Sequence, residues 1–295
     1  MKPVRKAVLP VAGFGTRVLP ATKTVPKEML TVVDRPALQY VVDEAVEAGI
    51  EHFIFITARG KNAIEDYFDH AYELEDALAQ KGKVDILKTL QSKTPREGTT
   101  SFIRQQKAKG LGHAVWCARD IIGDEPFAVL LPDVLIQSQT SCLAQMVKAY
   151  EKVGGNIIAV DPVPEDRVSS YGVIKPKAGE NYKSKKIIPI DGMVEKPNIT
   201  EAPSNLKITG RYILQPELMG LLRDQAAGAG GEIQLTDAMA RLMDMQDFHA
   251  FAYEGQDYDC GSKLGYFEAV LAFALQNEEI GAAAKDLVRR SVQLD

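Results

Sequence analysis

Short apolar runs alternate with helix-like segments through the first half of the chain, and this alternation restricts the possible folds more than any other feature. Five runs have the length and apolar character of buried strands, at residues 6–12, 52–57, 101–105, 127–131 and 156–160. The intervening segments 37–48, 62–80, 112–122 and 142–153 show helical periodicity. Strands that alternate with helices predict a mostly parallel sheet covered on both faces, as in doubly wound, Rossmann-like α/β proteins.

The pattern changes after Pro162. Strand-like runs at 171–175, 187–195 and 208–214 are separated by turn residues, and helical patterns return at 232–245, 263–277 and 280–292. We therefore expect a single domain over residues 1–295 with three parts. Residues 1–161 would form a core, residues 162–262 an added mixed-sheet lobe, and residues 263–295 C-terminal helices that could pack in the core or between subunits. The polar stretch 81–98 is expected to be a surface excursion.

Composition excludes several classes of protein. A net charge of −5 argues against a general nucleic-acid binder, which usually shows a basic face. No apolar run approaches the roughly 18 residues that a membrane span needs, and the first residues predict a strand rather than a secretory signal. The 3 cysteines have neither CxxC spacing nor an even count, so reduced thiols and a cytoplasmic location are expected.

A glycine-containing loop, Gly13-Phe14-Gly15-Thr16-Arg17, follows the first strand. Glycines allow backbone N–H groups to approach a phosphate, and ligands of open α/β sheets bind beyond the carboxyl ends of strands. The loop lacks the third glycine of a dinucleotide fingerprint, where Val18 stands, and no Gly-Lys-Ser/Thr follows as in a P-loop. A tight turn without a ligand remains an alternative if the glycines alone are considered.

Three cations, Arg17, Lys23 and Lys27, follow in a segment that Pro20 and Pro26 stiffen. Two phosphate-bearing substrates repel each other, so a reaction between them requires fixed positive charge. Each lysine taken alone is also compatible with a solvated surface charge.

Two aspartates are candidates for a metal site. Asp133 directly follows the strand-like run 127–132, and Asp259 comes soon after another such run at 248–253. Mg²⁺ prefers one or two carboxylates together with phosphate and water oxygens. A helix N-cap or a turn would also explain either residue. The 4 histidines share no short motif, and each is expected to be structural.

The segment Leu9–Leu30 fits the pattern L-x-x-A-G-x-G-T-R-x-x-P-x-T-K-x-x-P-K-E-M-L. This pattern resembles the signature of the sugar-phosphate nucleotidyltransferases and, within them, of the bacterial UTP–glucose-1-phosphate uridylyltransferases. The resemblance extends over nearly the whole chain through AYELEDAL, LLPDVLI, YGVIKP, VEKP, GEIQLTDA and YDCGSKLGY, in that order. One departure is Val134, where many relatives have a second acid, so no role is expected for a carboxylate next to Asp133.

The resemblance implies a reaction in which UTP and glucose 1-phosphate give UDP-glucose and pyrophosphate with Mg²⁺, catalysed by a homodimer or homotetramer. The expected catalytic residues are Arg17, Lys27, Asp133 and Lys196. The expected nucleotide contacts are Ala12, Gly13, Gly15, Thr16, Glu28, Gln105 and Gly110. The expected sugar-phosphate contacts are Gly172, Glu195, Lys196, Gly210 and Arg211, and the expected metal ligands are Asp133 and Asp259.

The residue chemistry is compatible with these roles. An amide such as that of Gln105 both donates and accepts, as the O4 and N3–H edge of uracil requires, and Gly110 would let backbone approach the base. A phosphate monoester is mostly dianionic at neutral pH, so the sugar phosphate needs no protein base to attack UTP.

Two other hypotheses stay open. The chain could be a related pyrophosphorylase that uses dTTP or another nucleotide, although PATK-x-x-PKEML favours UTP. It could also be a catalytically silent regulatory paralogue that binds nucleotide sugars. Such a paralogue should have lost loop residues, whereas Gly15, Thr16 and Arg17 are all present.

Overall fold

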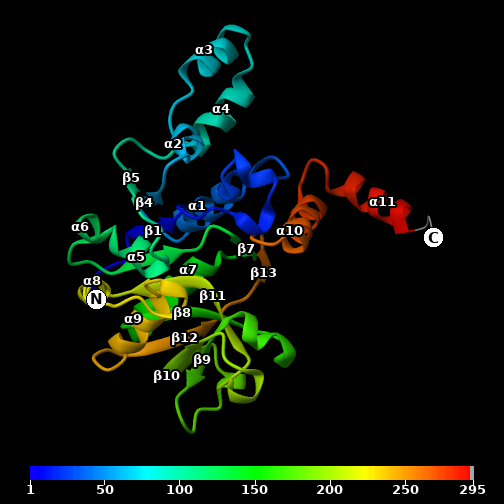
Figure 1. Cartoon of the computed structure of the whole chain (residues 1–295). Coiled ribbons are helices and arrows are strands. Elements are labelled where there is room, and N and C mark those ends of the chain that lie inside the picture. Colours follow the sequence, from blue (N-terminus) through cyan, green and yellow to red (C-terminus); the bar gives the residue numbers. More distant parts are fainter. Residues whose placement is uncertain (293–295) are drawn as a thin grey trace.

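The computed structural model describes residues 1–292 and is built around a nine-stranded sheet (Figure 1). In spatial order its strands are β5 (Thr100–Arg104), β4 (His52–Thr57), β1 (Lys6–Pro10), β6 (Phe127–Leu130), β11 (Leu206–Leu214), β8 (Asn156–Pro162), β12 (Phe248–Ala252), β10 (Ile187–Glu195) and β9 (Gly172–Pro176). The predicted α/β architecture is confirmed, and the strands of the lobe predicted after Pro162 belong to this same sheet.

Strand direction changes in the middle of this sheet. Strands β5, β4, β1 and β6 are mutually parallel, whereas β11 runs antiparallel to both of its main neighbours, β6 and β8. The carboxyl ends of the parallel strands therefore lie at one edge of the sheet. Strand β11 runs in the opposite direction beside β6, and its residue Arg211 pairs with Leu130 near that edge. Residues 210–214 are thereby brought next to residues 127–131, although about 80 positions separate them in sequence.

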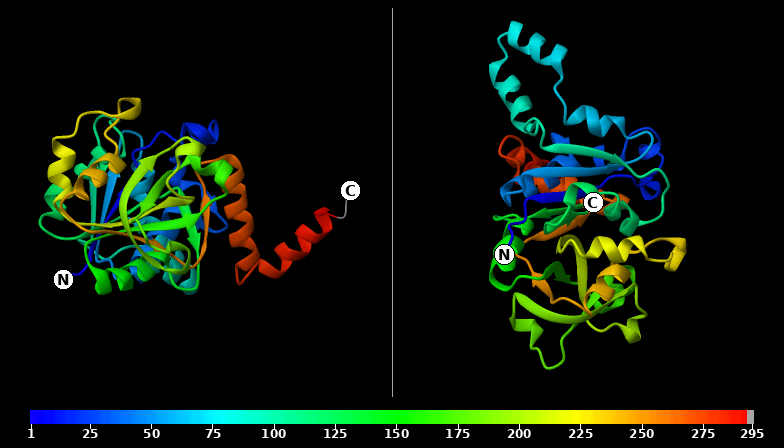
Figure 2. Two further views of the ribbon diagram at one scale, coloured as in Figure 1. Left: turned by 90° about the horizontal axis from the view of Figure 1, so that it is seen from below. Right: turned by 90° about the vertical axis from the view of Figure 1, so that its left-hand side faces the viewer.

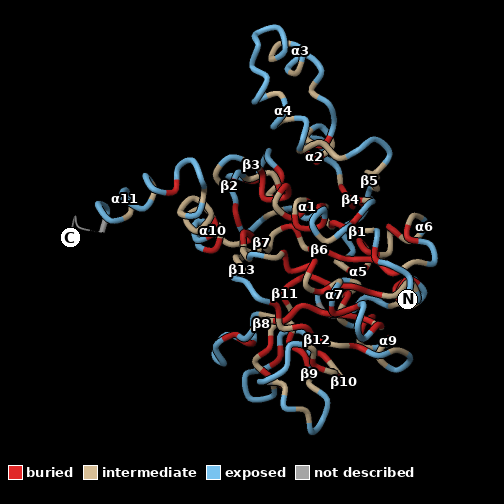
Figure 3. Tube along the Cα trace, turned by 180° about the vertical axis from the view of Figure 1, so that it is seen from behind, coloured by how far each residue is buried: buried red, intermediate tan, exposed pale blue. Residues whose placement is uncertain are grey.

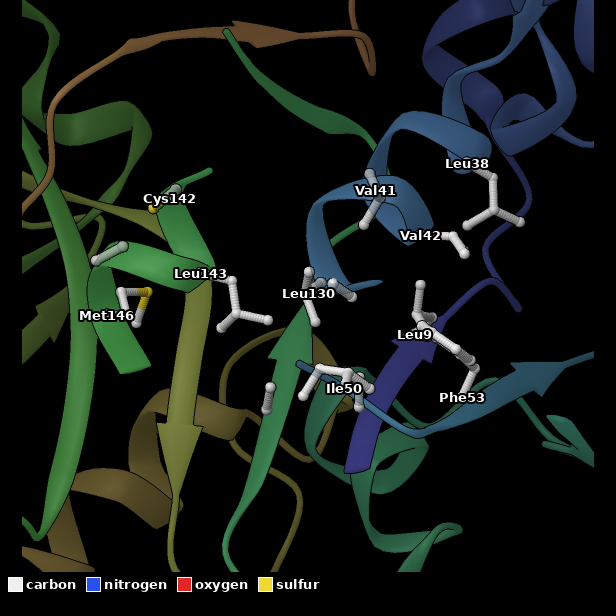
Figure 4. Packing of buried hydrophobic residues seen from close by; sticks show 14 of the residues in the cluster. Leu9, Leu38, Val41, Val42, Ile50, Phe53, Leu130, Cys142, Leu143 and Met146 are labelled. Carbon is white, nitrogen blue, oxygen red and sulfur yellow. The ribbon is translucent and has the colours of Figure 1, made fainter. Parts of the chain in front are cut away.

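Helices cover both faces, because alternate strand residues point to opposite sides. Leu9 of β1 packs with α1 (Ala37–Glu47) and α7 (Cys142–Val153), while its neighbour Val8 packs with helices on the other face (Figure 4). Those helices are α5 (Leu111–Trp116), α6 (Arg119–Ile122), α8 (Leu218–Arg223) and α9 (Leu235–Leu242). The helix expected over 112–122 is thus two short helices, and the one expected over 232–245 is shorter.

The segment 62–98 differs most from the prediction. The single helix expected over 62–80 is broken into α2 (Asn62–Tyr67) and α3 (Tyr72–Gln80), and the expected excursion 81–98 contains α4 (Val84–Lys93). Neither α3 nor α4 has a buried residue, and the pair projects from the body as a hairpin (Figure 3). The sequence predicted helix for the part that forms α3 but not for α4, and the core of this chain covers neither helix.

Two small antiparallel ladders and two terminal helices complete the fold. The ladders pair β2 (Thr31–Val32) with β3 (Arg35–Pro36) and β7 (Val134–Gln137) with β13 (Gln256–Asp259). Helices α10 (Lys263–Gln276) and α11 (Gly281–Val292) follow, and α11 extends away from the body (Figure 2). The predicted C-terminal helices are confirmed over these ranges. Within residues 1–292, no helix is long and apolar enough to cross a membrane.

Candidate active site

The glycine loop leaves β1 and folds back onto the segment that carries Lys27. Gly15 has φ 65°, a conformation that side chains disfavour, and a Cβ there would lie 3.1 Å from Cβ of Lys27. The hydroxyl of Thr22 donates to the Gly15 carbonyl at 2.7 Å. The loop is therefore fixed against the turn Lys27–Met29, and Gly15 is needed because the two segments approach so closely.

Two cations and two carboxylates meet beyond the carboxyl ends of β1 and β6. The Lys27 ammonium lies 2.6 Å from Oδ2 of Asp133. The Arg17 guanidinium lies 3.5 Å from Asp133 and 3.6 Å from Oδ2 of Asp259. Residues that are far apart in sequence thus converge on one point, which we call the charge cluster: Arg17, Lys27, Asp133 and Asp259.

Strand pairing explains why the two acids are adjacent. Asp259 is the last residue of β13 and pairs with Val134, the first residue of β7, so Asp133 is the next residue beyond that pair. The Cys260 amide donates to the Asp133 carbonyl at 2.8 Å, and the Gly261 amide donates to the Asp259 carboxylate at 2.9 Å. The short ladder therefore fixes the backbone of both acids.

Asp133 is held in its charged form. Burial alone would raise its pKa, but the Lys27 ammonium and the Arg17 guanidinium together hold the pKa of this carboxyl below its ordinary value. A carboxylate that stays ionised is available as an oxygen ligand for a cation across the neutral range.

The charge cluster opens into a cavity of about 590 Å³. Its walls include many residues that the sequence predicts for the site: Arg17, Asp133, Gly172, Glu195, Lys196, Gly210 and Asp259. Arg17 and Asp133 on the predicted nucleotide side, and Glu195 and Lys196 on the predicted sugar side, thus face one volume that is large enough for a ligand of small-molecule size. The predicted site residues Ala12, Gly13, Gly15, Thr16 and Lys27 do not line it.

The sugar side is built from the end of the β9–β10 pair. Glu195 pairs with Gly172 across the ladder, and a Cβ on Gly172 would lie 2.9 Å from the Glu195 carboxylate. Thr236 donates to this carboxylate at 3.3 Å, and the Lys196 ammonium lies 3.9 Å from it. Lys196 has φ 48° directly before Pro197, where extended backbone is usual. Such strain in a non-glycine residue is characteristic of functional positions.

The predicted base-reading residues are in contact with each other. The side-chain amide of Gln105 donates to the Gly110 carbonyl at 3.2 Å and lies 3.0 Å from Nδ1 of His113. Gly110 has φ 96°, and a Cβ there would meet the backbone of Ile233 at 2.8 Å. Neither residue lines the 590 Å³ cavity, and their contact with a base stays a prediction.

Glu28 lies in the interior, not on the cavity wall. Its Oε2 accepts a hydrogen bond from the Lys61 ammonium at 2.7 Å, and its Oε1 has no hydrogen-bond partner. Burial raises the pKa of Glu28 above its ordinary value even with Lys61 beside it. The sequence did not identify Lys61, and the predicted nucleotide contact of Glu28 remains a prediction.

The predicted contact between Arg211 and the sugar phosphate is corrected by the structure. The Arg211 side chain is 0% exposed and pairs with Glu44 of α1 at 3.0 Å. The adjacent Gly210 does line the cavity, with φ 77° and the Leu131 side chain packed where a Cβ would stand. The Arg211 side chain instead extends into the interior toward α1, where its guanidinium contacts both carboxylate oxygens of Glu44.

Lys207 and Asp257 also line the cavity, and the sequence analysis did not identify them. The Lys207 ammonium contacts both carboxylate oxygens of Asp257, at 2.9 and 2.7 Å. One signal could have revealed Asp257: it stands two positions before Asp259, so the two share a face of any strand that contains both. Lys207 is an isolated lysine in an apolar strand and gave no comparable signal.

The acids of the charge cluster suit a magnesium ion. Within residues 1–292 no group of three or more His, Cys, Asp or Glu side chains is arranged to enclose a metal. Two converging carboxylates, from Asp133 and Asp259, leave room for phosphate and water oxygens, as Mg²⁺ prefers. The cations now paired with these carboxylates show that the position attracts positive charge.

Comparison with known proteins agrees with this geometry. Residues 6–276 match the nucleotidyl transferase family. A UTP–glucose-1-phosphate uridylyltransferase of Bacillus subtilis (strain 168) is 50% identical over 280 residues, which cover 95% of this chain and 94% of the relative. A UTP-bound UGPase from Acinetobacter baumannii superposes with TM-score 0.90 at 45% identity, over 99% of this chain and 100% of that structure. A UDP-glucose pyrophosphorylase complexed with UDP-glucose superposes with TM-score 0.81 at 42% identity, over 93% of this chain and 100% of that structure.

Proposed function

Because the chain belongs to the nucleotidyl transferase family, we propose that it transfers the uridylyl group of UTP to glucose 1-phosphate, giving UDP-glucose and pyrophosphate. The observation that carries this proposal is the cavity in which Arg17, Asp133 and Asp259 of the charge cluster face Glu195 and Lys196. A relative with 50% identity is named for this reaction, and similar structures contain UTP or UDP-glucose.

The reaction needs alignment and charge stabilisation more than proton transfer. An oxygen of the dianionic sugar phosphate attacks the α-phosphorus of UTP, a new P–O bond forms, and the bond from the α-phosphorus to the bridging oxygen breaks. The electron pair leaves with pyrophosphate. Arg17 and Lys27 would stabilise the negative charge that builds on the transferred and departing phosphates. Lys196 would balance the charge of the incoming sugar phosphate.

We propose Mg²⁺ as the metal, held by Asp133 and Asp259. The bound ion would neutralise phosphate charge and orient the two substrates. Asp133 is suited to this role because its neighbours keep it ionised. Lys27 and Arg17, which contact the same carboxylates, would then contact phosphate oxygens.

Recognition of the two substrates is proposed for opposite sides of the site. Gln105 and Gly110 would read the uracil edge, while Ala12, Gly13, Gly15 and Thr16 would present backbone to the nucleotide. Glu195 would accept hydrogen bonds from sugar hydroxyls, and Gly172 and Gly210, which line the same cavity, would contact the sugar phosphate through their backbone. These hydrogen-bonding groups would favour the matching base and sugar strongly, because a mismatched ligand would leave them buried without partners.

We also propose a homodimer or homotetramer. Two projecting parts of the chain expose large apolar side chains, Tyr72 and Ile86 on the α3–α4 hairpin and Phe267 and Leu287 on α10 and α11. Exposed apolar surface of this kind favours burial between subunits. A cytoplasmic location is proposed as well, since the three cysteines are free thiols.

The purified protein should convert UTP and glucose 1-phosphate to UDP-glucose when Mg²⁺ is supplied, and should run in reverse with UDP-glucose and pyrophosphate. Product can be followed by anion-exchange chromatography across UTP, dTTP, CTP and ATP. A preference for dTTP would identify a related pyrophosphorylase. Nucleotide-sugar binding without turnover of any nucleotide would identify a regulatory paralogue.

A further inference from the structure

The turn that carries Asp133 has inward-facing carbonyl groups that need partners. This turn, residues 131–134, connects β6 to β7 at the edge of the cavity. Its backbone is tied by the Leu131 amide, which donates to the Gly210 carbonyl at 2.9 Å. Buried carbonyls without donors are costly, so the partners of Leu131 and Val134 determine how firmly the turn is held.

One buried side chain supplies those partners. Nη1 of Arg211 donates to the Leu131 carbonyl at 3.0 Å, and Nη2 donates to the Val134 carbonyl at 2.7 Å. The two carbonyls flank Asp133, whose own carbonyl accepts from the Cys260 amide. The backbone on both sides of the aspartate is therefore fixed by a single guanidinium.

The charge of this guanidinium is balanced inside the protein. Nε and Nη2 of Arg211 contact the two carboxylate oxygens of Glu44 at 3.1 and 3.0 Å, and the same carboxylate accepts from the Leu143 amide at 3.0 Å. An unpaired buried charge would be strongly destabilising, so Glu44 allows Arg211 to stay in the interior. The clamp, Glu44–Arg211, thereby connects α1 and the start of α7 to the Asp133 turn.

We propose that Arg211 is a positioning residue for the reaction: it touches no substrate and holds Asp133, through its flanking carbonyls, where the metal and the phosphates are bound. This inference rests on the proposed function for its kinetic consequence. Only arginine has the required geometry, because its planar group reaches two carbonyls and two carboxylate oxygens at once. Lysine keeps the charge but presents its donors from one nitrogen, so it can pair with Glu44 without spanning both carbonyls.

The test compares Arg211→Lys with Arg35→Lys. Arg35 also contacts a carboxylate at two points, Asp34 at 3.0 and 3.1 Å, but lies outside the cavity. We expect Arg211→Lys to unfold cooperatively yet to lose at least tenfold in kcat, to need several times more Mg²⁺ for half-maximal activity, and to leave the KM for glucose 1-phosphate within twofold. Arg35→Lys should change none of these kinetic values.

A second readout needs no turnover. Amide hydrogen exchange of the peptide 131–137, measured without ligand, should be faster in Arg211→Lys than in the parent, whereas Arg35→Lys should leave it unchanged. Mn²⁺ binding in the presence of UTP, followed by electron paramagnetic resonance, should weaken severalfold. If the parent protein makes no UDP-glucose, the proposed function fails, but exchange and Mn²⁺ binding still decide whether the clamp holds Asp133.

A double variant, Glu44→Leu with Arg211→Met, guards against a single variant that does not fold. Replacing a buried pair by apolar residues of similar volume is often neutral for folding, but it removes the guanidinium donors from both carbonyls and leaves that of Leu131 only the Val134 amide at 3.4 Å. We expect a folded protein with the same kinetic and exchange defects. Normal kcat, Mg²⁺ dependence and exchange in a folded variant, with only a lower melting temperature, would overturn the proposal.

Discussion

The two sides of the cavity are organised differently. On the nucleotide side Lys27 contacts Asp133 at 2.6 Å, and the side chains of both are only 17% exposed. On the sugar side Lys196 and Glu195 are 3.9 Å apart, with side chains 65% and 35% exposed. The Lys27–Asp133 pair is thus fixed and partly buried, while water still screens the Lys196–Glu195 pair.

This difference has a consequence for catalysis. Fixed charges stabilise a transition state without reorganising, so their loss should reduce the rate of the chemical step. Exposed ion pairs contribute about 0–1 kcal/mol, so the sugar side should act mainly through the contacts that the substrate brings. Variants of the first side should therefore change kcat strongly, and variants of the second side should change mainly KM.

The largest effect is expected from Asp133→Asn. The substitution removes a charge that the metal and Lys27 both use, and kcat should fall roughly a hundredfold or more, equivalent to about 3 kcal/mol. The fold should persist because the replacement has the same shape. Steady-state kinetics and thermal unfolding measure the two effects. Asp191→Asn, at an exposed acid outside the cavity, is the control. Near-normal turnover of Asp133→Asn would contradict a preformed nucleotide side.

Arg17→Ala should have the next largest effect. The side chain is 61% exposed, so it contributes little to folding, yet it bridges Asp133 and Asp259. We expect kcat/KM for UTP to fall at least tenfold, about 1.4 kcal/mol, with little change in melting temperature. Arg119→Ala, at a surface arginine outside the cavity, serves as the control. Unchanged activity per folded molecule would make Arg17 a structural residue.

Gln105→Leu tests the base-reading part of the nucleotide side. Leucine removes the amide that contacts Gly110 and His113, and should cost on the order of 1–3 kcal/mol in kcat/KM for UTP. The kcat/KM values for UTP, CTP and ATP should become more similar to one another. If the ratios among these values stay as they are in the parent protein, the base is read elsewhere.

Glu195→Gln should have a smaller and different effect. The amide can still accept a hydrogen bond, so the KM for glucose 1-phosphate should rise only severalfold, about 1 kcal/mol, with kcat nearly unchanged. The KM for UTP is the internal control and should stay constant. A large fall in kcat would show that the sugar side is as rigidly organised as the nucleotide side.

Asp161→Asn should have the smallest effect of these substitutions, and only on stability. Burial, and then the nearby Asp257 carboxylate, raise its pKa from 3.8 to about 6. The folded protein therefore binds a proton more tightly than the unfolded chain, and this contribution to stability is lost as pH rises from about 4 through 6. In Asp161→Asn the melting temperature should depend less on pH between 4 and 7. An unchanged pH dependence would show that Asp161 has an ordinary pKa.

The sequence predicted those parts of the site that local patterns determine. A strand, a glycine loop and a cationic segment are contiguous, so Arg17 and Lys27 could be assigned to one edge of the sheet. Asp133 could be added because it follows a buried strand. These residues do meet in the structure.

Long-range pairing set the limit of prediction. Arg211 stands 167 positions from Glu44, and only the antiparallel insertion of β11 beside β6 brings its side chain under the Asp133 turn. Nothing near either residue indicates that contact. The α3–α4 hairpin shows the opposite difficulty. The sequence indicates a helical pattern only in its first half, and no residue of either helix is buried, so its position could not be inferred from core packing, although Lys93 of α4 contacts Asp43 of α1 at 3.0 Å.

The central claim is that two substrates bound side by side react directly, without a protein nucleophile. Exchange of radiolabelled pyrophosphate into UTP tests it most directly, measured with Mg²⁺ and UTP alone and then with UDP-glucose as the uridylyl donor. We predict label in UTP only when UDP-glucose is present, since its reaction with pyrophosphate forms UTP and glucose 1-phosphate in one step. Exchange with UTP alone would reveal a uridylylated protein intermediate, and no label in either mixture would contradict the proposed activity.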